Sequence, residues 1–277
     1  MWEEKRLLPL LAEAFTIQET KTLDELVDKI VSAPVPCICI LENIHHLYLR
    51  TVNGFDSVER LMLFMQKTRG SVFWIVSCAL FGWQYLDKVM SISTFFQKDI
   101  MLGTQSREQM SSIILKRHRM SGYRIKYEIP SEVTKTRKFK RLHDDRDRQA
   151  FMETLVFRQL AEMSAGNIRV AMLFWLTTIK AIDSENIVVT PKIGFDHTFL
   201  YQLPEEELFT LAALIQHEIL NAHDHTLVFR QDNIDSMLIL NKMLSRGLVQ
   251  LQPSGFYVHP FLYRPVVEVL RSKKMLQ

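Results

Sequence analysis

Two apolar stretches, Cys37-Ile-Cys-Ile-Leu-Glu-Asn43 and Val72-Phe-Trp-Ile-Val-Ser-Cys78, set the fold class of this chain. Each is a continuous apolar run of strand length that ends at a polar residue, Glu42 or Ser77. Strands that are apolar on both faces are typical of parallel sheets covered by helices. Segment 56–68 between them carries apolar residues at helical spacing. The three segments therefore predict a strand–helix–strand unit with a parallel sheet.

The remainder of the chain is predicted to be mostly helical. We expect helices over 3–15, 23–31, 83–96, 106–118, 151–164, 167–182, 205–221, 233–246 and 261–275, and a short strand over 99–102. Thr22 and Glu25 have the spacing of a capping box. Segment 249–259 is typical of a hairpin with Pro253-Ser254-Gly255 as its turn. The last four elements (helix, helix, hairpin, helix) have the order of a winged helix.

Length and composition exclude several classes of protein. The chain has 277 residues, is 47% hydrophobic and 23% charged, and has a formal net charge of +3. This length predicts two or three domains, and this apolar content excludes disorder as the main state. Three cysteines make no disulfide framework. No apolar run reaches the ~18 residues of a membrane span, and no cleavable apolar leader opens the sequence. We expect a soluble, cytoplasmic protein with no membrane contact.

The positive charge is concentrated in segment 124–149. This segment holds nine Lys or Arg against five Asp or Glu, so the remainder of the chain is slightly acidic. It lacks periodicity, and we expect a mobile loop. A local basic segment is a candidate for contact with phosphates or an acidic partner, whereas the body of the chain is not. A merely solvated loop is the alternative.

Glu42 and Ser77 are candidate site residues because of their place at the strand ends. In open α/β sheets, ligands bind beyond the carboxyl ends of the parallel strands. A carboxylate there can hold Mg²⁺, directly or through water, and a hydroxyl on the next strand can position water or a γ-phosphate. Each residue also has a plainer interpretation. Glu42 would cap the turn after its strand, and Ser77 would be a small residue at a tight strand end.

These features resemble AAA-type P-loop ATPases downstream of their phosphate loop. The likeness is to bacterial ATP-binding proteins related to origin-recognition initiators and to STAND switch ATPases. Segment 37–43 resembles Walker B, and segment 72–78 resembles the sensor-1 strand. Ser164-Ala-Gly-Asn-Ile-Arg169, followed by an apolar helix, is similar to the lid helix whose arginine is sensor 2. The resemblance covers about residues 20–277 and rests more on the order of elements than on a sharp motif.

The resemblance implies a fold class and three domains. The class is α/β, with a partial parallel P-loop-type sheet followed by an all-α lid and a winged-helix domain. Residues 1–104 would form the partial ATPase core. Residues 105–194 would form the helical lid with the basic loop 124–149, and residues 195–277 the winged helix.

The chain departs from the family pattern at the phosphate loop. Walker A, G-x-x-x-x-G-K-[ST], holds phosphates through its backbone N–H groups and its lysine. None of the nine glycines of this chain is followed by lysine. In the family the Walker A strand lies between the sensor-1 strand and the last strand, here 72–77 and 99–102, so the sheet would lack its middle. The chain is then the C-terminal portion of a longer protein, which we favour, or it has rebuilt its sheet, or a partner supplies the strand.

The resemblance implies a switch and not a motor. Glu42 and Asn43 replace the usual aspartate and catalytic glutamate of Walker B, and an amide cannot act as a general base. Hydrolysis would be slow or absent, and this chain alone would be inactive as an ATPase. ATP and Mg²⁺ would bind only with a phosphate loop from outside this chain, with Glu42 on the magnesium. The residues implied to sense nucleotide are Glu42, Asn43, Ser77 and Arg169.

Other residues that could carry chemistry have plainer interpretations, as does Arg169, which could be a helix-surface arginine. Two groups of histidines could suggest a metal. They are His45 with His46, and His217, His223 and His225 with Asp224. Adjacent histidines point in different directions on a helix or a strand, and histidine near a helix end is ordinary. Cys37 and Cys39 share one face of a buried strand and are expected to pack in the core.

The alternative class of function is a non-enzymatic winged-helix module that binds protein or DNA on a degenerate ATPase scaffold. Helix 233–246 would be its recognition helix. Phosphate binding requires a surplus of Lys and Arg, which this helix lacks because Asp232 and Asp235 offset Lys242 and Arg246. A protein partner, or the remainder of a longer chain, is therefore the favoured contact. Nucleic acid is a candidate partner through 124–149 or the winged helix.

Overall fold

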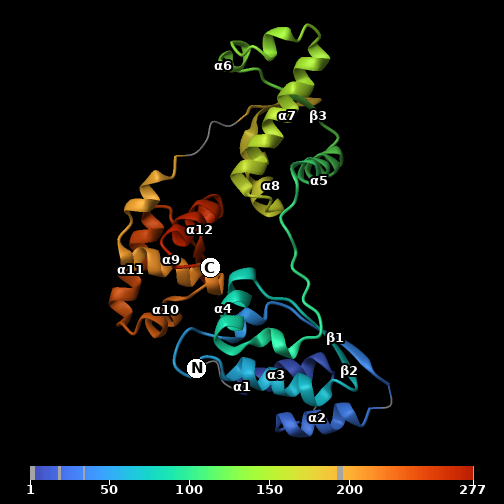
Figure 1. Cartoon of the computed structure of the whole chain (residues 1–277), viewed down its shortest axis with the longest axis vertical. Coiled ribbons are helices and arrows are strands. Elements are labelled where there is room, and N and C mark those ends of the chain that lie inside the picture. Colours follow the sequence, from blue (N-terminus) through green and yellow to red (C-terminus); the bar gives the residue numbers. More distant parts are fainter. Residues whose placement is uncertain (1–3, 18–19, 34, 192–195, 277) are drawn as a thin grey trace. The chain divides into compact units, whose positions relative to one another are not determined.

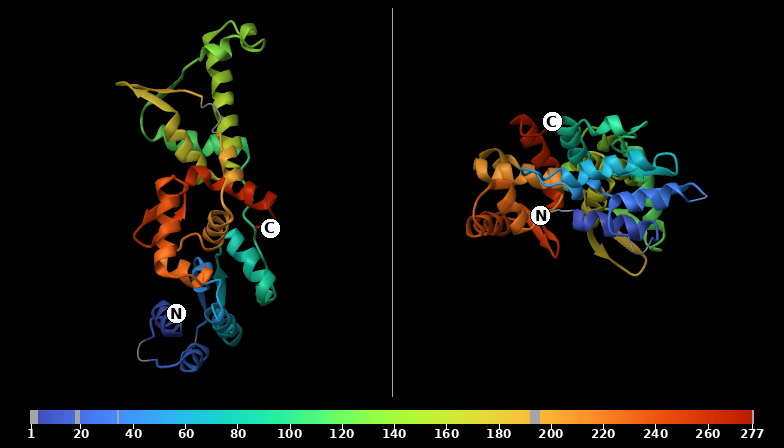
Figure 2. Two further views of the ribbon diagram at one scale, coloured as in Figure 1. Left: turned by 90° about the vertical axis from the view of Figure 1, so that its left-hand side faces the viewer. Right: turned by 90° about the horizontal axis from the view of Figure 1, so that it is seen from below.

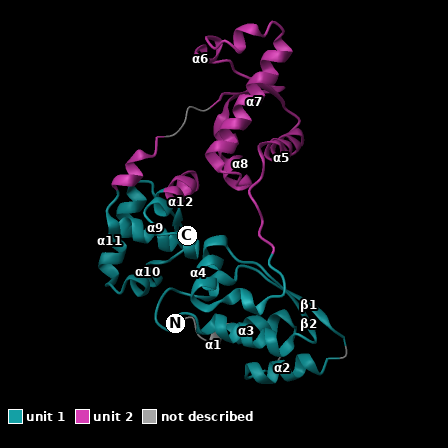
Figure 3. Ribbon diagram, viewed as in Figure 1, with its two compact units in different colours: residues 1–99, 203–259, 269–277 teal, residues 100–202, 260–268 magenta. Residues whose placement is uncertain are grey.

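The computed structural model describes residues 4–17, 20–33, 35–191 and 196–276 (Figure 1). The chain forms two compact units (Figure 3). Unit 1 holds 1–99, 203–259 and 269–277, and unit 2 holds 100–202 and 260–268. The fold is mixed α/β and mostly helical, with small sheets. None of the described helices has both the length and the apolar character that a membrane span requires.

Unit 1 contains two small sheets and seven complete α-helices among its described residues. Its strands are β1 (Cys37–Leu41), β2 (Val72–Val76), β6 (Val249–Gln252) and β7 (Gly255–Val258). Its helices are α1 (Glu4–Ala14), α2 (Leu23–Val31), α3 (Asp56–Thr68), α4 (Leu80–Met90), α9 (Glu205–His217), α10 (Ala222–Phe229) and α11 (Asn233–Ser245), with 3₁₀ helices η1 (Ile44–Leu47) and η2 (Ile92–Phe95). Helix α12 (Tyr263–Ser272) is divided between the two units.

Strands β1 and β2 pair in parallel around α3, which confirms the predicted strand–helix–strand unit. The register runs from Cys37 opposite Val72 to Leu41 opposite Val76. The face that carries Cys39 and Leu41 is buried in a core shared with α1, α2 and α3. Thr22 caps α2, where its hydroxyl accepts a hydrogen bond from the Glu25 N–H at 3.2 Å. The predicted helix start at residue 3 lies outside the described residues.

The opposite face of this sheet is exposed. Ile38 and Ile40 of β1 lie beside Phe73 and Ile75 of β2, and these four side chains are 45–68% exposed. The expectation that helices cover both faces of the sheet is therefore wrong within the described residues. The expectation of a strand over 99–102 is also wrong. A strand needs a hydrogen-bonded neighbour, and sheet β1–β2 has only two strands among the described residues.

The segment 205–259 contains the predicted hairpin. Strands β6 and β7 pair antiparallel with Gln252 opposite Gly255, so Pro253 and Ser254 form the turn. Helix α9 ends at His217, four residues before the predicted end. The structure adds α10, which the sequence did not predict. Asn221 starts α10 by accepting a hydrogen bond from the Asp224 N–H at 2.8 Å.

Unit 2 is built on the helix pair α7 and α8 (Figure 2). Its helices are α5 (Arg107–Arg119), α6 (Ser131–Thr134), α7 (Asp145–Ser164) and α8 (Ile168–Thr178), with 3₁₀ helices η3 (Phe139–Arg141), η4 (Thr198–Gln202) and η5 (Pro260–Leu262). Its strands are β3 (Arg124–Tyr127), β4 (Ile179–Ile182) and β5 (Asn186–Val189). Phe157 of α7 stacks on Trp175 of α8 with ring centroids 5.6 Å apart, inside a continuous apolar core.

Three expectations for unit 2 are wrong. The lid is not all-α, because β3, β5 and β4 form a sheet in which β5 pairs parallel with β3 and antiparallel with β4. Segment 124–149 is not a mobile loop, since it forms β3, α6, η3 and the start of α7. The helix predicted over 167–182 ends at Thr178, because 179–182 pairs with β5. The predicted boundary between 194 and 195 lies outside the described residues.

Candidate functional site

The carboxyl ends of β1 and β2 bring Asn43 and Ser77 into direct contact. The Ser77 hydroxyl accepts a hydrogen bond from the Asn43 N–H at 3.0 Å. Backbone bonds continue the pairing past the strand ends, with the Ser77 N–H bonded to the Leu41 carbonyl and the Ile44 N–H bonded to the Ser77 carbonyl. Asn43 has φ of +60°, a left-handed conformation that asparagine tolerates. Glu42, Asn43 and Ser77 are all exposed.

Glu42 presents a single carboxylate at this edge. A bound Mg²⁺ keeps several waters and takes one or two carboxylates together with substrate phosphates. Within the described residues no second acid joins Glu42 in a metal-binding group. The strand ends alone therefore do not make a magnesium site, and the missing ligands would have to arrive with a nucleotide.

Arg169 is placed by a tight helix–helix turn in unit 2. Gly166 has φ of +76°, and an added Cβ would lie 2.6 Å from the Thr104 Cβ, so a side chain does not fit there. Asn167 caps α8 by accepting a hydrogen bond from the Val170 N–H at 3.2 Å. Arg169 follows in the first turn and is exposed. A cation at a helix N-terminus opposes the helix dipole, so helix stability does not explain this arginine.

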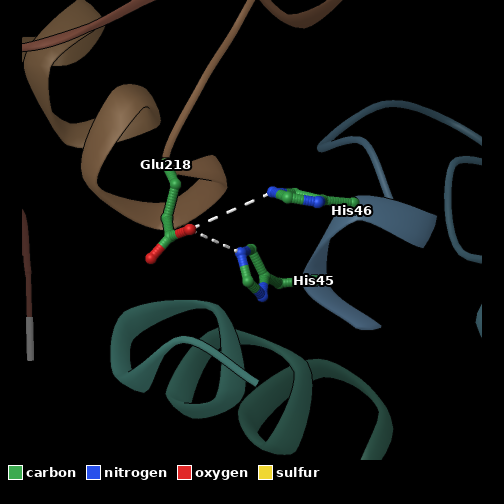
Figure 4. Close-up of side chains that lie close together, drawn as sticks. All are labelled: His45, His46 and Glu218. Carbon is green, nitrogen blue, oxygen red and sulfur yellow. Dashed lines mark hydrogen bonds and ion pairs between the residues drawn. The ribbon is translucent and has the colours of Figure 1, made fainter. Parts of the chain in front are cut away.

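The adjacent histidines His45 and His46 meet Glu218, which no local motif indicated, elsewhere in unit 1 (Figure 4). The Nε2 atoms of His45 and His46 lie 3.0 and 4.0 Å from the same Glu218 oxygen. The expectation that adjacent histidines diverge is wrong here, since their ring centroids are 4.3 Å apart in η1. His45 is fully buried, whereas about half of the Glu218 side chain is exposed. The contact of the two histidines with Glu218 could be predicted only after the fold is known, because His45 and Glu218 lie 173 positions apart.

The hydrogen bonds of His45 argue against a metal. Its Nδ1 accepts the N–H of Ala79 at 3.1 Å. The proton of the neutral ring is therefore on Nε2, which donates it to Glu218. Histidines that bind metals usually have the reverse arrangement, in which the second nitrogen donates to an acceptor. We interpret the three residues as a hydrogen-bonded junction between η1 and the end of α9.

Zinc should leave the melting temperature of the chain unchanged, and His45→Phe should lower the free energy of unfolding by about 1–3 kcal/mol. The Ala79 N–H would lose its acceptor in a partly buried place. Thermal and urea unfolding with and without Zn²⁺ measure both effects, and His143→Phe at an exposed histidine is the control. A zinc-dependent rise in melting temperature that His46→Gln removes would show that the junction binds metal after all.

Further contacts fix the same junction. The Tyr48 hydroxyl donates to the Gln216 carbonyl at 3.2 Å, and Arg50 donates to the Gln216 side-chain oxygen at 3.3 Å. Gly82 permits the close approach of α4, because a Cβ at this position would lie 2.8 Å from the His45 Cβ. The end of α9 is therefore tightly packed against η1 and α4.

The other group of histidines considered in the sequence analysis does not converge on one point. His217 is buried beside the Tyr48 ring, with centroids 4.6 Å apart. His225 is buried between the hydroxyls of Thr210 and Ser236, each at 3.0 Å, and His223 is exposed. They form no metal-binding group with Asp224 among the described residues. Cys39 is buried, as expected for core packing, whereas Cys37 is exposed.

Neither a protein-family model nor a curated protein matches this chain. Among solved structures it is similar to a mutant of Thermotoga maritima RuvB, with 12% identity over 90% of this chain and 75% of that chain and a TM-score of 0.34. It is similar to Aeropyrum pernix ORC2, with 13% identity over 92% of this chain and 71% of that chain and a TM-score of 0.39. It is also similar to Cdc6p from Pyrobaculum aerophilum, with 13% identity over 95% of this chain and 75% of that chain and a TM-score of 0.32. Similarity at this level assigns neither activity nor ligand.

Proposed function

We propose that this chain is the C-terminal part of an AAA-type or STAND-like ATP switch that hydrolyses ATP slowly or not at all. Glu42, Asn43 and Ser77 would meet a nucleotide held by a phosphate loop outside this chain, and Arg169 of unit 2 would act as the sensor-2 arginine. The observation that carries the proposal is the pair of parallel strands whose carboxyl ends present an acid and a hydroxyl side by side.

The exposed sheet face supports the requirement for a further segment. Ile38, Ile40, Phe73 and Ile75 form one continuous apolar face with 45–68% of each side chain exposed. Buried apolar area stabilises by about 25 cal/mol per Å², so a helix packed on this face would be held firmly. The remainder of a longer chain is the covering segment that we favour, and a partner protein is the other.

A hydrogen-bonded connection supports a switching role. Ala79 lies two residues beyond Ser77, and its N–H bonds to His45, whose other nitrogen bonds to Glu218 at the end of α9. A nucleotide that moves the end of β2 would thereby act on α9 and on the hairpin β6–β7, which packs against α9. A ligand shifts such an equilibrium only through its different affinity for the two arrangements.

We expect the native protein to be longer than 277 residues and to carry G-x-x-x-x-G-K-[ST] upstream. Mass spectrometry of the protein isolated from its own cells tests this. In that complete protein, Mg·ATP should change hydrogen exchange in α9, and Glu42→Gln or Arg169→Ala should reduce the change. Glu59→Gln and Arg158→Ala, at exposed positions of the same charges, are the controls. A native protein with no upstream phosphate loop would end the nucleotide proposal.

A non-enzymatic protein-binding module is the second candidate function, and α11 favours it over DNA reading. The cations Lys242 and Arg246 are paired with Glu207, so they are not free for phosphates. Ile234 and Leu238 lie one turn apart on α11 and are 78% and 66% exposed. An exposed apolar helix face is typical of a protein contact. In this case partner binding would not depend on ATP.

A further inference from the structure

A seven-residue turn in unit 2 carries the densest positive charge in the chain. Lys-Thr-Arg-Lys-Phe-Lys-Arg, residues 135–141, has five cations and no acid. The turn runs from the end of α6 through η3. The next acidic residue along the chain is Asp144, the N-cap of α7.

The turn is anchored by its one aromatic residue. Phe139 is 7% exposed and packs edge-on against Phe151 of α7, with centroids 5.8 Å apart. The Arg148 guanidinium lies 5.9 Å from the centroid of the Phe139 ring, and its Nε donates to the Leu142 carbonyl at 3.2 Å. The Phe139 N–H is bonded to the Thr136 hydroxyl. The backbone of the turn is therefore held in one conformation.

The five cations of the turn are all exposed. None of them makes an ion pair within 4 Å of an acid in the described part of the chain. They are Lys135, Arg137, Lys138, Lys140 and Arg141. Five like charges on an ordered backbone repel one another, and no ion pair of the described residues offsets this. Such an arrangement costs stability unless an anionic partner binds there.

We propose that this turn binds the phosphate backbone of double-stranded nucleic acid without reading its sequence. Cations that replace condensed counterions on the duplex supply this kind of affinity. The turn has no exposed aromatic side chain on which an unpaired base could stack. Residues 131–144 also present no large exposed apolar side chain that could enter a bilayer or form the apolar centre of a protein interface. The proposal stands apart from the nucleotide switch.

The test is the salt dependence of binding to a short DNA duplex of mixed sequence, measured by fluorescence anisotropy with the full chain. For each phosphate contact, the binding constant falls with about the 0.9th power of the salt concentration. Five contacts therefore predict a loss of affinity of roughly 500-fold between about 50 and 200 mM salt. The triple variant Arg137→Gln/Lys138→Gln/Lys140→Gln leaves two contacts. Its affinity should fall by only roughly 12-fold over the same range and be weaker throughout.

A matched triple variant distinguishes DNA binding by this turn from a general effect of the net charge of the chain. Arg69→Gln/Lys88→Gln/Lys98→Gln removes the same charge at exposed positions of unit 1 and should keep the native salt dependence. Arg137→Lys/Arg141→Lys should keep it as well, because charge and not side-chain shape is required. Equal losses in both triple variants would overturn the proposal. So would tighter binding to poly-glutamate or to anionic lipid vesicles than to the duplex.

Discussion

Acidification from about pH 7.5 to about pH 5 should lower the free energy of unfolding of unit 1 by about 2 kcal/mol through His217 alone. Burial lowers the pKa of this histidine to about 3, and the nearby Arg50, His45 and His46 act in the same direction. Its Nε2 has no hydrogen-bond partner in the described part of the chain. The folded protein therefore holds His217 neutral, with nothing among those residues to receive a second ring proton.

The direction in which pH changes the stability follows from the protons that each state binds. The unfolded chain takes up a proton on His217 below about pH 6.5, whereas the folded chain does so only near pH 3. Protons therefore favour the unfolded state in this window, and stability is complete above about pH 6.5 and is lost as the pH falls toward 3. Burial lowers the pKa of His225 to about 4, so this histidine adds a loss of the same sign.

Urea unfolding followed by hydrogen exchange of the α9 amides measures this loss in unit 1. His217→Phe removes the titrating group, and its loss of stability on acidification should be smaller than that of the native chain by about 2 kcal/mol. His143→Gln changes an exposed histidine of unit 2 and should keep the native dependence on pH. If His217→Phe loses as much stability as the native chain, another group causes the acid sensitivity.

The local pattern of the sequence predicted most elements of unit 1. Strands β1 and β2 and helices α2 and α3 lie where their apolar spacing and the flanking polar residues place them. The hairpin turn at Pro253 and Ser254 was also predictable, because both residues favour turns. In each of these elements the decisive information lies within about a dozen neighbouring residues, so propensity and pattern agree with the fold.

The errors lie where a distant partner decides the conformation. Segment 179–182 continues a helical pattern, but it pairs with β5 across a tight connection. Segment 124–127 has no strand signal of its own beyond Ile125 and Tyr127, yet it pairs with β5, about 60 residues later. Segment 99–102 has a strand's composition but no partner strand among the described residues. Pairing, and not local preference, determines these three segments.

In the candidate site, too, contacts between neighbouring strands were predictable from the sequence, whereas contacts between distant residues were not. The contact between Asn43 and Ser77 follows from the rule that neighbouring parallel strands end at one edge. The bond between His45 and Glu218 joins residues 173 positions apart, and neither lies in a pattern that indicates the other. The anchor of the basic turn was missed for a related reason, because a single phenylalanine among cations gives no periodic signal.

Removing the two cations beside Glu207 should destabilise unit 1 far more than removing Glu207 itself. Glu207 of α9 has a fully buried side chain. It is held by Lys242 at 2.9 Å and by Arg246 at 2.5 Å, both from the α11 segment and both partly exposed. In the double variant Lys242→Met/Arg246→Met, the Glu207 carboxylate stays buried without compensation, which costs about 3–5 kcal/mol. In Glu207→Leu the two cations simply return to water.

Urea unfolding of the chain and its variants gives the order directly. The double variant should be the least stable, and Glu207→Leu should lie close to the native chain. Adding Glu207→Leu to the double variant should restore most of the lost free energy of unfolding, because an apolar residue then replaces the buried carboxylate that has no cation beside it. The exposed pair Arg264 and Glu268, removed by Arg264→Met, is the control for a solvated ion pair and should change little. If the triple variant is no more stable than the double, the loss comes from the contacts of the cations' aliphatic stems and not from the buried carboxylate.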